Sequence, residues 1–298
     1  MASSFPLPLP FDPARPLKDA IAARVVSFFN DPSRGERPVT PRPDGLFGPN
    51  SVTWRVHADV TGMMVGGIAS LFLQMLHPRV LAGVWDHSNF RADMHGRLRR
   101  TARFIAVTTY GGREEAEAAI ARVRRIHDQV RGVLPDGTPY AASEPWLLAW
   151  VHVTETWCFL EGWRVYGEPR MSRADQDRYF AEMARIGAAL GADPVPRSRR
   201  EAELLMARFR PELRVDGRTR SVRDLLLRTA SDDPLTAAVQ AMGNRAAIAL
   251  LPAWARRLHG LASPLLARPL VQGATYAVAE AIRWAFAGRE RGAAAARS

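Results

Sequence analysis

The run TGMMVGGIASLFLQMLH, residues 61–77, constrains the fold most, because it holds no charged side chain before its final histidine. It falls just short of the roughly 18 apolar residues that indicate a membrane span. A helix that is apolar on every side is more simply a buried, central helix, so membrane contact is compatible with this segment but not required. Gly62, Gly66 and Ser70 recur every fourth residue and form a smooth stripe that admits a neighbouring helix backbone or a flat ligand. We interpret the stripe as a helix-packing surface.

Amphipathic helical patterns account for most of the remaining chain, and the alternating pattern of strands is scarce. A chain of 298 residues is also long enough to bury a large core. The sequence therefore predicts an all-α fold with a single globular, multi-helix domain. The expected helices cover residues 17–30, 53–77, 78–88, 92–109, 113–132, 144–166, 172–190, 198–208, 221–230, 234–248, 252–260 and 267–288.

Composition shifts divide the chain into three parts. Residues 1–45 are expected to form a proline-rich arm with a short helix, and residues 46–288 to form the all-α domain. The small, polar residues 289–298 are expected to be a disordered tail.

The charge balance and the single cysteine restrict the function classes. The formal net charge is +11 and Lys18 is the only lysine, but the arginines are scattered along amphipathic patterns. No compact basic run is interleaved with aromatic residues, so we expect no nucleic-acid partner. The single cysteine, Cys158, excludes an intrachain disulfide and a multi-cysteine metal site. The N-terminus lacks the basic start and long apolar run of a secretory signal, so we expect a cytoplasmic protein.

His127 stands out among the seven histidines because it lies on an apolar helical face. In REEAEAAIARVRRIHDQVRG it follows Ala116, Ile120 and Val123 at the spacing of a buried face, with charged residues on the other sides. A neutral imidazole buried there needs hydrogen-bond partners or a metal. The pattern alone leaves both interpretations open and favours a hydrogen-bonded core histidine.

His152 repeats this placement in PWLLAWVHVTETWCFLEGW, where Glu155 follows it by three residues. Four tryptophans in the same region predict a broad aromatic wall, which suits a core or a pocket for a large planar cofactor; they are Trp146, Trp150, Trp157 and Trp163. His57, His95 and His259 lie in polar surroundings and have little to recommend them as ligands.

Arg97 and Thr101 lie four residues apart in RADMHGRLRRTARF, on one face of an expected helix. A guanidinium and a hydroxyl at this spacing suit a carboxylate or a peroxide-like oxygen. A solvated arginine face is the simpler interpretation of the pattern alone.

Six segments occur in an order typical of one family. They are LFLQMLHPRVLAGVWDHSNF, RLRRTARFIAVTTYGG, RVRRIHDQVRG, YAASEPWLLAWVHVTETW, GADPVPRS and LLPAWARRLHG. Together they resemble the catalytic domain shared by latex-clearing (rubber) oxygenases and MpaB-type oxygenases, over about residues 50–260.

The resemblance implies a globin-related helical architecture around a pocket for haem b. It implies that His127 is the metal ligand and that Arg97 and Thr101 belong to the family's Arg-x-x-x-Thr motif. His152 corresponds to a further histidine of the haem region, and Arg131 is a candidate partner for a haem propionate. The expected activity is that of a haem-dependent oxygenase or peroxidase-like enzyme, which uses dioxygen or peroxide on a small to medium apolar substrate.

The chain departs from the rubber oxygenases at Arg100, where they can carry a lysine that reaches the iron. Arginine remains protonated and offers no lone pair to a metal, so Arg100 is expected near the cofactor but not as a ligand. Asp86 and Glu155 are candidates for the family's catalytic carboxylate by location only. Two alternatives remain open: a non-haem iron oxygenase that uses His127, His152 and Glu155, and a non-catalytic protein that binds haem or an apolar ligand.

Overall fold

The computed structural model describes residues 13–228, 233–261 and 268–295. These residues form thirteen α-helices, two short 3-10 helices and one two-stranded hairpin, which confirms the all-α, single-domain prediction. The helices are α1 Arg15–Phe29, α2 Val52–His57, α3 Val60–Gln74, α4 Pro78–His87, α5 Met94–Tyr110, α6 Arg113–Gln129, α7 Pro145–Tyr166, α8 Arg173–Leu190, α9 Arg199–Phe209, α10 Gly217–Leu227, α11 Pro234–Leu250, α12 Ala253–His259 and α13 Arg268–Ala295.

Helices α3 and α7 form the centre of the molecule and lie with their backbones in contact. A Cβ atom at Gly66 would lie 2.7 Å from the carbonyl oxygen of Cys158, and one at Gly162 would lie 2.3 Å from that of Gly62. Real side chains never approach a backbone this closely, so glycine is required at both positions. The glycine stripe is therefore a helix-packing surface, as the sequence predicted.

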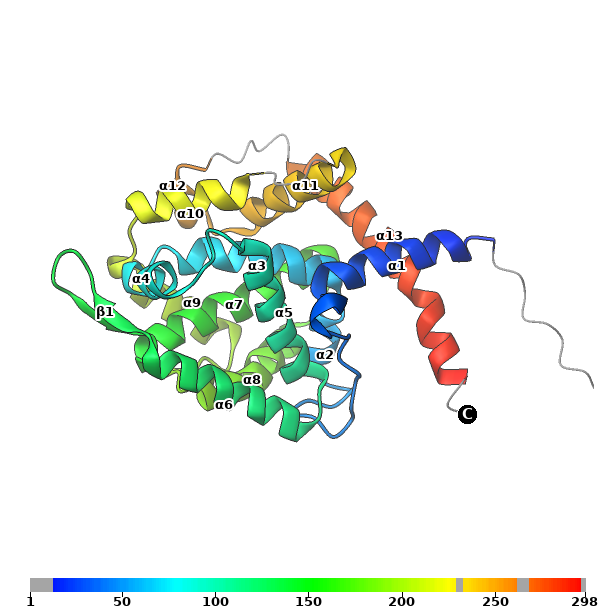
Figure 1. Ribbon diagram of the computed structural model, residues 1–298, viewed down its shortest axis with the longest axis horizontal. Coiled ribbons are helices and arrows are strands. Elements are labelled where there is room, and N and C mark those ends of the chain that lie inside the picture. The colour runs from blue at the N-terminus through cyan, green and yellow to red at the C-terminus, as the bar shows by residue number, and fades with distance from the viewer. Residues whose placement is uncertain (1–12, 229–232, 262–267, 296–298) are drawn as a thin grey trace, which may run out of the picture.

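The remaining helices enclose this pair, as Figure 1 shows. In that view α10, α11 and α12 lie above α3 and α7, whereas α6 and α8 lie below them. Helices α1 and α13 lie against each other at one end of the molecule, next to α3 and α11. This arrangement buries the large aromatic residues of α7 and α8, and its fully buried side chains include Trp150, Tyr166 and Tyr179.

The expected helix over residues 53–77 is divided in two, because Asp59 ends one helix and begins the next. Its carboxylate accepts a hydrogen bond from the backbone N–H of Gly62 at 2.6 Å, which caps α3. Arg283 of α13 donates to the same carboxylate at 2.8 Å. The interruption separates α2 from α3, and α2 packs against α8 as well as α3.

The expected helix over residues 113–132 ends earlier, and a hairpin follows it. Strand β1, Arg131–Val133, pairs antiparallel with β2, Pro139–Ala141, with Gly132 opposite Tyr140. A Cβ at Gly132 would lie 2.5 Å from the Tyr140 hydroxyl, so the tyrosine lies across this glycine. At the C-terminus α13 continues to Ala295, and residues 1–12 and 296–298 lie outside the described part of the chain.

Among the described residues, no single helix has the length and apolar composition to cross a membrane. The pair α3 and α4 meets both criteria jointly, but the two helices are bent by 106° relative to each other.

Candidate active site

Helices α5, α6, α7 and α8 enclose a pocket of about 570 Å³, a volume that includes its open mouth. Its wall is mostly apolar, and its polar groups are few. They are His57, Thr108, Thr109, His127, His152 and Glu155. A mostly apolar pocket with a few convergent polar groups is typical of a small-molecule site. The pocket therefore brings His127 and His152 together and adds groups from α2 and α5.

His152 extends from α7 into a position that is defined by a glycine on the facing helix. Its side chain is buried, and a Cβ at Gly187 of α8 would lie 2.8 Å from its Nε2 atom. That Nε2 atom has no hydrogen-bond partner within the described chain. Burial lowers the pKa of His152 to about 4, so the imidazole is neutral at physiological pH.

His127 reaches the same pocket from the last turn of α6. Its Nδ1 atom is buried and lacks a hydrogen-bond partner among the described residues, and burial lowers the pKa of the ring. The Nδ1 atoms of His77 and His259 also lack a partner among the described residues, so this feature is not particular to His127. What distinguishes His127 from those two histidines is that its ring lines the pocket.

Glu155 lies one turn beyond His152 on α7 and lines the same pocket. Burial raises the pKa of this carboxyl to about 7, because the ionised form loses its hydration there. The group can therefore exchange a proton near neutral pH. Asp86, the other carboxylate predicted by location, lies elsewhere and accepts hydrogen bonds from Tyr140 at 2.8 Å and Arg218 at 3.3 Å.

His57 is a pocket residue that the sequence did not predict. Its Nδ1 lies 2.7 Å from Thr109 Oγ1 and its Nε2 lies 2.9 Å from the Tyr179 hydroxyl, so both ring nitrogens have partners. Burial lowers its pKa to about 3. The sequence contains one sign of this position. His57 follows Thr53 by four residues, which places both side chains on the buried face of a short helix.

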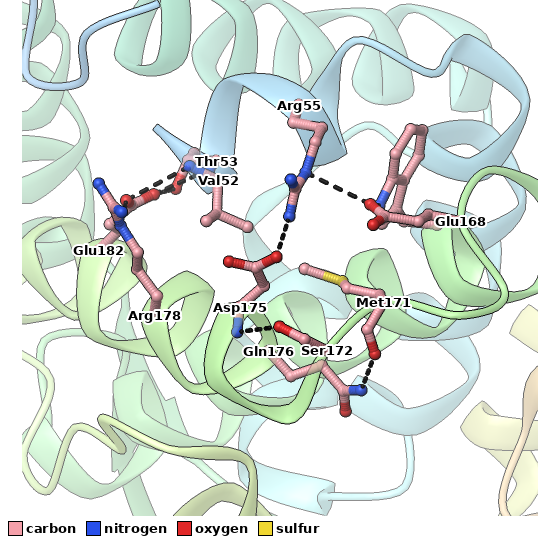
Figure 2. Close-up of polar contacts among 11 residues, drawn as sticks. Val52, Thr53, Arg55, Glu168, Met171, Ser172, Asp175, Gln176, Arg178 and Glu182 are labelled. Carbon is pink, nitrogen blue, oxygen red and sulfur yellow. Dashed lines mark hydrogen bonds and ion pairs between the residues drawn. The ribbon is translucent and has the colours of Figure 1, made fainter. Parts of the chain in front are cut away.

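A polar network fixes α2, and with it His57, against α8 (Figure 2). The buried carboxylate of Glu182 accepts hydrogen bonds at 2.8 Å from both the backbone N–H and the hydroxyl of Thr53, at the N-terminus of α2. On the outer side, Arg55 pairs with Asp175 at 2.8 Å and with Glu168 at 3.3 Å. A carboxylate at a helix N-terminus also interacts favourably with the helix dipole. Because α2 and α8 both contribute residues to the pocket, these contacts fix the position of one helix relative to the other.

The family model described as "ER-bound oxygenase mpaB/B'/Rubber oxygenase, catalytic domain" matches residues 54–284. The chain belongs to this family. The match covers most of the chain and every residue of the pocket except Phe47, and it supports an oxygenase and hence an enzyme. No curated protein and no solved structure matches the chain.

In this family member, Arg97 and Thr101 do not line the pocket that contains His127. Arg97 is half-buried in a second cavity, where its Nη1 donates to Ser88 Oγ at 3.2 Å. Thr101 is exposed, and its hydroxyl donates to the carbonyl oxygen of Arg97 at 3.2 Å. Their predicted role at a cofactor stays a prediction.

Arg100 and Arg131, the other predicted cofactor contacts, are both exposed. Arg100 lies 3.5 Å from the carboxylate of Asp93, and Arg131 donates to the carbonyl oxygen of Asp128 at 2.7 Å. Neither side chain lines the pocket of His127.

The tryptophans of α7 pack in the core and do not line this pocket. Trp150 is fully buried, and Trp146 stacks on Phe209 with ring centroids 4.0 Å apart. The planar cofactor wall that the sequence suggested is therefore not made by these residues. Phe47, Phe104 and Phe159 supply the aromatic surface of the pocket instead.

The described residues contain no cluster of three histidine, cysteine, aspartate or glutamate side chains that could hold a metal ion. His127, His152 and Glu155 share a pocket but do not converge as a three-ligand site. The arrangement instead offers separate imidazoles on a mostly apolar wall.

Proposed function

We propose that this protein is a haem-b-dependent oxygenase that acts on a small to medium apolar organic substrate with dioxygen or peroxide. The observation that carries the proposal is the pair of neutral, incompletely hydrogen-bonded imidazoles, His127 and His152, in one apolar pocket of an oxygenase-family domain. The non-haem alternative is weaker, because no three-ligand cluster is formed by the described residues.

The donor set fits a histidine-ligated haem, because such an iron takes a protein imidazole that has a free nitrogen. His127 would hold the iron, since its ring lines the pocket from the C-terminal turn of α6 and burial keeps it neutral. When bound, the haem would supply the redox chemistry on oxygen that no amino-acid side chain provides.

The chain's own residues would orient the substrate and control protons. Phe104, Ile105 and Met183 line the pocket and would hold an apolar molecule while excluding water. Glu155 would accept or return a proton near neutral pH, as its raised pKa allows. His152 would remain neutral and accept or donate a hydrogen bond at Nε2, the atom that has no partner in the protein.

An absorption spectrum of the purified protein tests the proposal most directly. We expect a Soret band after haem supplementation, and we expect His127→Ala to lose it while helicity is retained. His95→Ala, which removes an exposed histidine at the start of α5, is the matched control and should keep the band. A haem-free spectrum under all conditions, or a Soret band that His127→Ala leaves unchanged, contradicts the assignment. Iron without porphyrin would favour the non-haem alternative, and bound haem with no turnover would favour a carrier.

A further inference from the structure

Three buried polar side chains form a hydrogen-bonded chain beside the pocket: Tyr179 of α8, His57 of α2 and Thr109 of α5. The Tyr179 hydroxyl lies 2.9 Å from Nε2 of the imidazole, and the Thr109 hydroxyl lies 2.7 Å from its Nδ1. The exposed fractions of Tyr179, His57 and Thr109 are 0%, 7% and 1%. A donor that stays unpaired in such a place costs free energy, so the available partners fix the directions of the two hydrogen bonds.

The imidazole of His57 is neutral, because burial lowers its pKa to about 3. A neutral imidazole has one N–H and one nitrogen that accepts, so it donates to one of its two neighbours and accepts from the other. Its proton lies either on Nδ1, beside Thr109, or on Nε2, beside Tyr179.

Tyr179 decides between these two tautomers. Burial raises the pKa of its hydroxyl, which therefore keeps its proton and needs an acceptor. Within the described chain its one hydrogen-bond partner is His57 Nε2, and Tyr179 does not line the pocket. If Nε2 carried the proton, the buried O–H of Tyr179 would have no acceptor. The geometry therefore favours the tautomer in which Tyr179 donates to Nε2 and Nδ1–H donates to Thr109 Oγ1.

This tautomer leaves the hydroxyl proton of Thr109 without an acceptor in the described chain. A threonine within a helix can donate to a backbone carbonyl one turn earlier, as neighbouring Thr108 does to Phe104 at 2.9 Å. The one hydrogen-bond partner of the Thr109 hydroxyl among the described residues is His57. Thr109 does line the pocket, so an acceptor for its proton can lie there.

The pocket around Thr109 suits a small, neutral acceptor. None of the described residues that line it is a lysine or an arginine, and Glu155 contributes a carboxyl group to its wall. An anion would therefore meet no opposite charge. The interior that a water-sized sphere can occupy is about 50 Å³. Since one water needs about 10–15 Å³ by this measure, the interior has room for a few water molecules or for the oxygen-bearing end of a ligand.

We propose that Thr109 donates a hydrogen bond to a neutral oxygen acceptor in the pocket, and that Tyr179, acting through His57, holds it in this role. In the protein without ligand the acceptor is a water molecule, which a ligand replaces with an oxygen atom of its own. Tyr179 and His57 are positioning residues, and the contact of Glu182 with Thr53 keeps α2 in place for them (Figure 2). Thr109 thus adds a specificity-determining residue to the proposed function, and its role does not rest on haem.

Long-range ¹H–¹⁵N correlation NMR of the full-length protein with ¹⁵N-labelled histidine, recorded without haem, shows which nitrogen of His57 is protonated. We expect the Nδ1–H tautomer at neutral pH. Tyr179→Phe should populate the Nε2–H tautomer, because it removes the group that selects between the two. Thr109→Val should keep the Nδ1–H tautomer, since Tyr179 still donates to Nε2. Tyr276→Phe, which removes a hydroxyl from an exposed tyrosine of α13, is the matched control and should leave the His57 signals unchanged.

Crystal structures that resolve ordered water test the donor itself. The unsubstituted protein should hold a water about 2.5–3.0 Å from Thr109 Oγ1 on the pocket side. Thr109→Val, which keeps the shape but removes the hydroxyl, should lose this water, and Thr109→Ser should retain it. Thr108→Val is the matched control, because Thr108 lines the same pocket but its hydroxyl donates to the backbone, and this variant should keep the water.

The NMR result that overturns the proposal is any state of His57 other than Nδ1–H in the unsubstituted protein, or an Nδ1–H tautomer that Tyr179→Phe leaves unchanged. The crystallographic result that overturns it is the absence of a water at Thr109, or a water that Thr109→Val leaves in place. Neither measurement involves haem, so a protein that fails to bind haem contradicts the proposed function and leaves the role of Thr109 intact.

Discussion

Replacing Glu155 with glutamine should change the pH dependence of stability in a direction that is fixed by its surroundings. Burial in the pocket raises the pKa of Glu155 from 4.5 to about 7, so between these values the folded protein keeps a proton that the unfolded chain releases. Stability falls with rising pH wherever the folded state binds more protons. The contribution of Glu155 is thus fully present below pH 4.5 and is lost as the pH rises to 7.

The size of this effect follows from the two pKa values. Each pH unit between them is worth about 1.4 kcal/mol, so the contribution changes by about 3 kcal/mol across the window. Glu155→Gln removes the titration. The stability of the unsubstituted protein relative to Glu155→Gln should therefore fall by about 3 kcal/mol from pH 4.5 to 7.5.

Urea unfolding followed by tryptophan fluorescence at half-unit pH intervals measures this difference. His57 and His152, whose pKa values burial lowers to about 3 and about 4, titrate in both proteins and cancel in the comparison. Glu117→Gln, on the exposed face of α6, is the control for the same substitution made outside the pocket. A stability difference for Glu155→Gln that stays constant within about 1 kcal/mol across the window would refute the inference that this carboxyl is buried and uncompensated.

Two packing predictions follow from the same site. Gly187→Ala places a Cβ 2.8 Å from His152 Nε2, and we expect it to lower the free energy of unfolding by about 1–3 kcal/mol; Gly67→Ala, with its nearest contact at 3.7 Å, should cost less than about 1 kcal/mol. If Gly187→Ala and Gly67→Ala lower the free energy of unfolding in urea by the same amount, the His152 imidazole moves aside freely and the packing argument is wrong. Glu182→Gln leaves the N-terminus of α2 without its carboxylate and should cost about 1–3 kcal/mol. Glu203→Gln, on the exposed side of α9, should cost less than about 1 kcal/mol, and similar melting temperatures for these two variants would contradict the anchoring role.

The sequence predicted the helical class and the central helix because these depend on periodicity, which is local. It did not predict the break at Asp59, since an aspartate within an apolar pattern is compatible with either a polar helix position or a cap. The contact that decides between them is with Arg283, more than two hundred residues away. The end of α6 was missed for a similar reason, because Arg131 and Gly132 continue a helical pattern but pair with a later strand.

The site was only partly predictable because its members come from five separate helices. His127 and His152 stood out by their apolar faces, and the pocket brings them together. His57 did not, because it lies next to polar residues in sequence, and only the fold places Thr109 and Tyr179 on its two nitrogens. Arg97 shows the opposite case. Its motif suggested a place beside the cofactor, whereas its side chain lines the second cavity and not the pocket of His127.

The backbone contact between α3 and α7 bears on how a ligand enters. Two helices that touch at Gly62, Gly66 and Gly162 leave no side-chain layer between them that could slide or compress. The α7 side of the pocket is consequently stiff, and α8 is joined to α2 by the buried carboxylate of Glu182. A ligand in this pocket therefore meets an α7 wall and an α8 wall that are each tied to a second helix, α3 and α2.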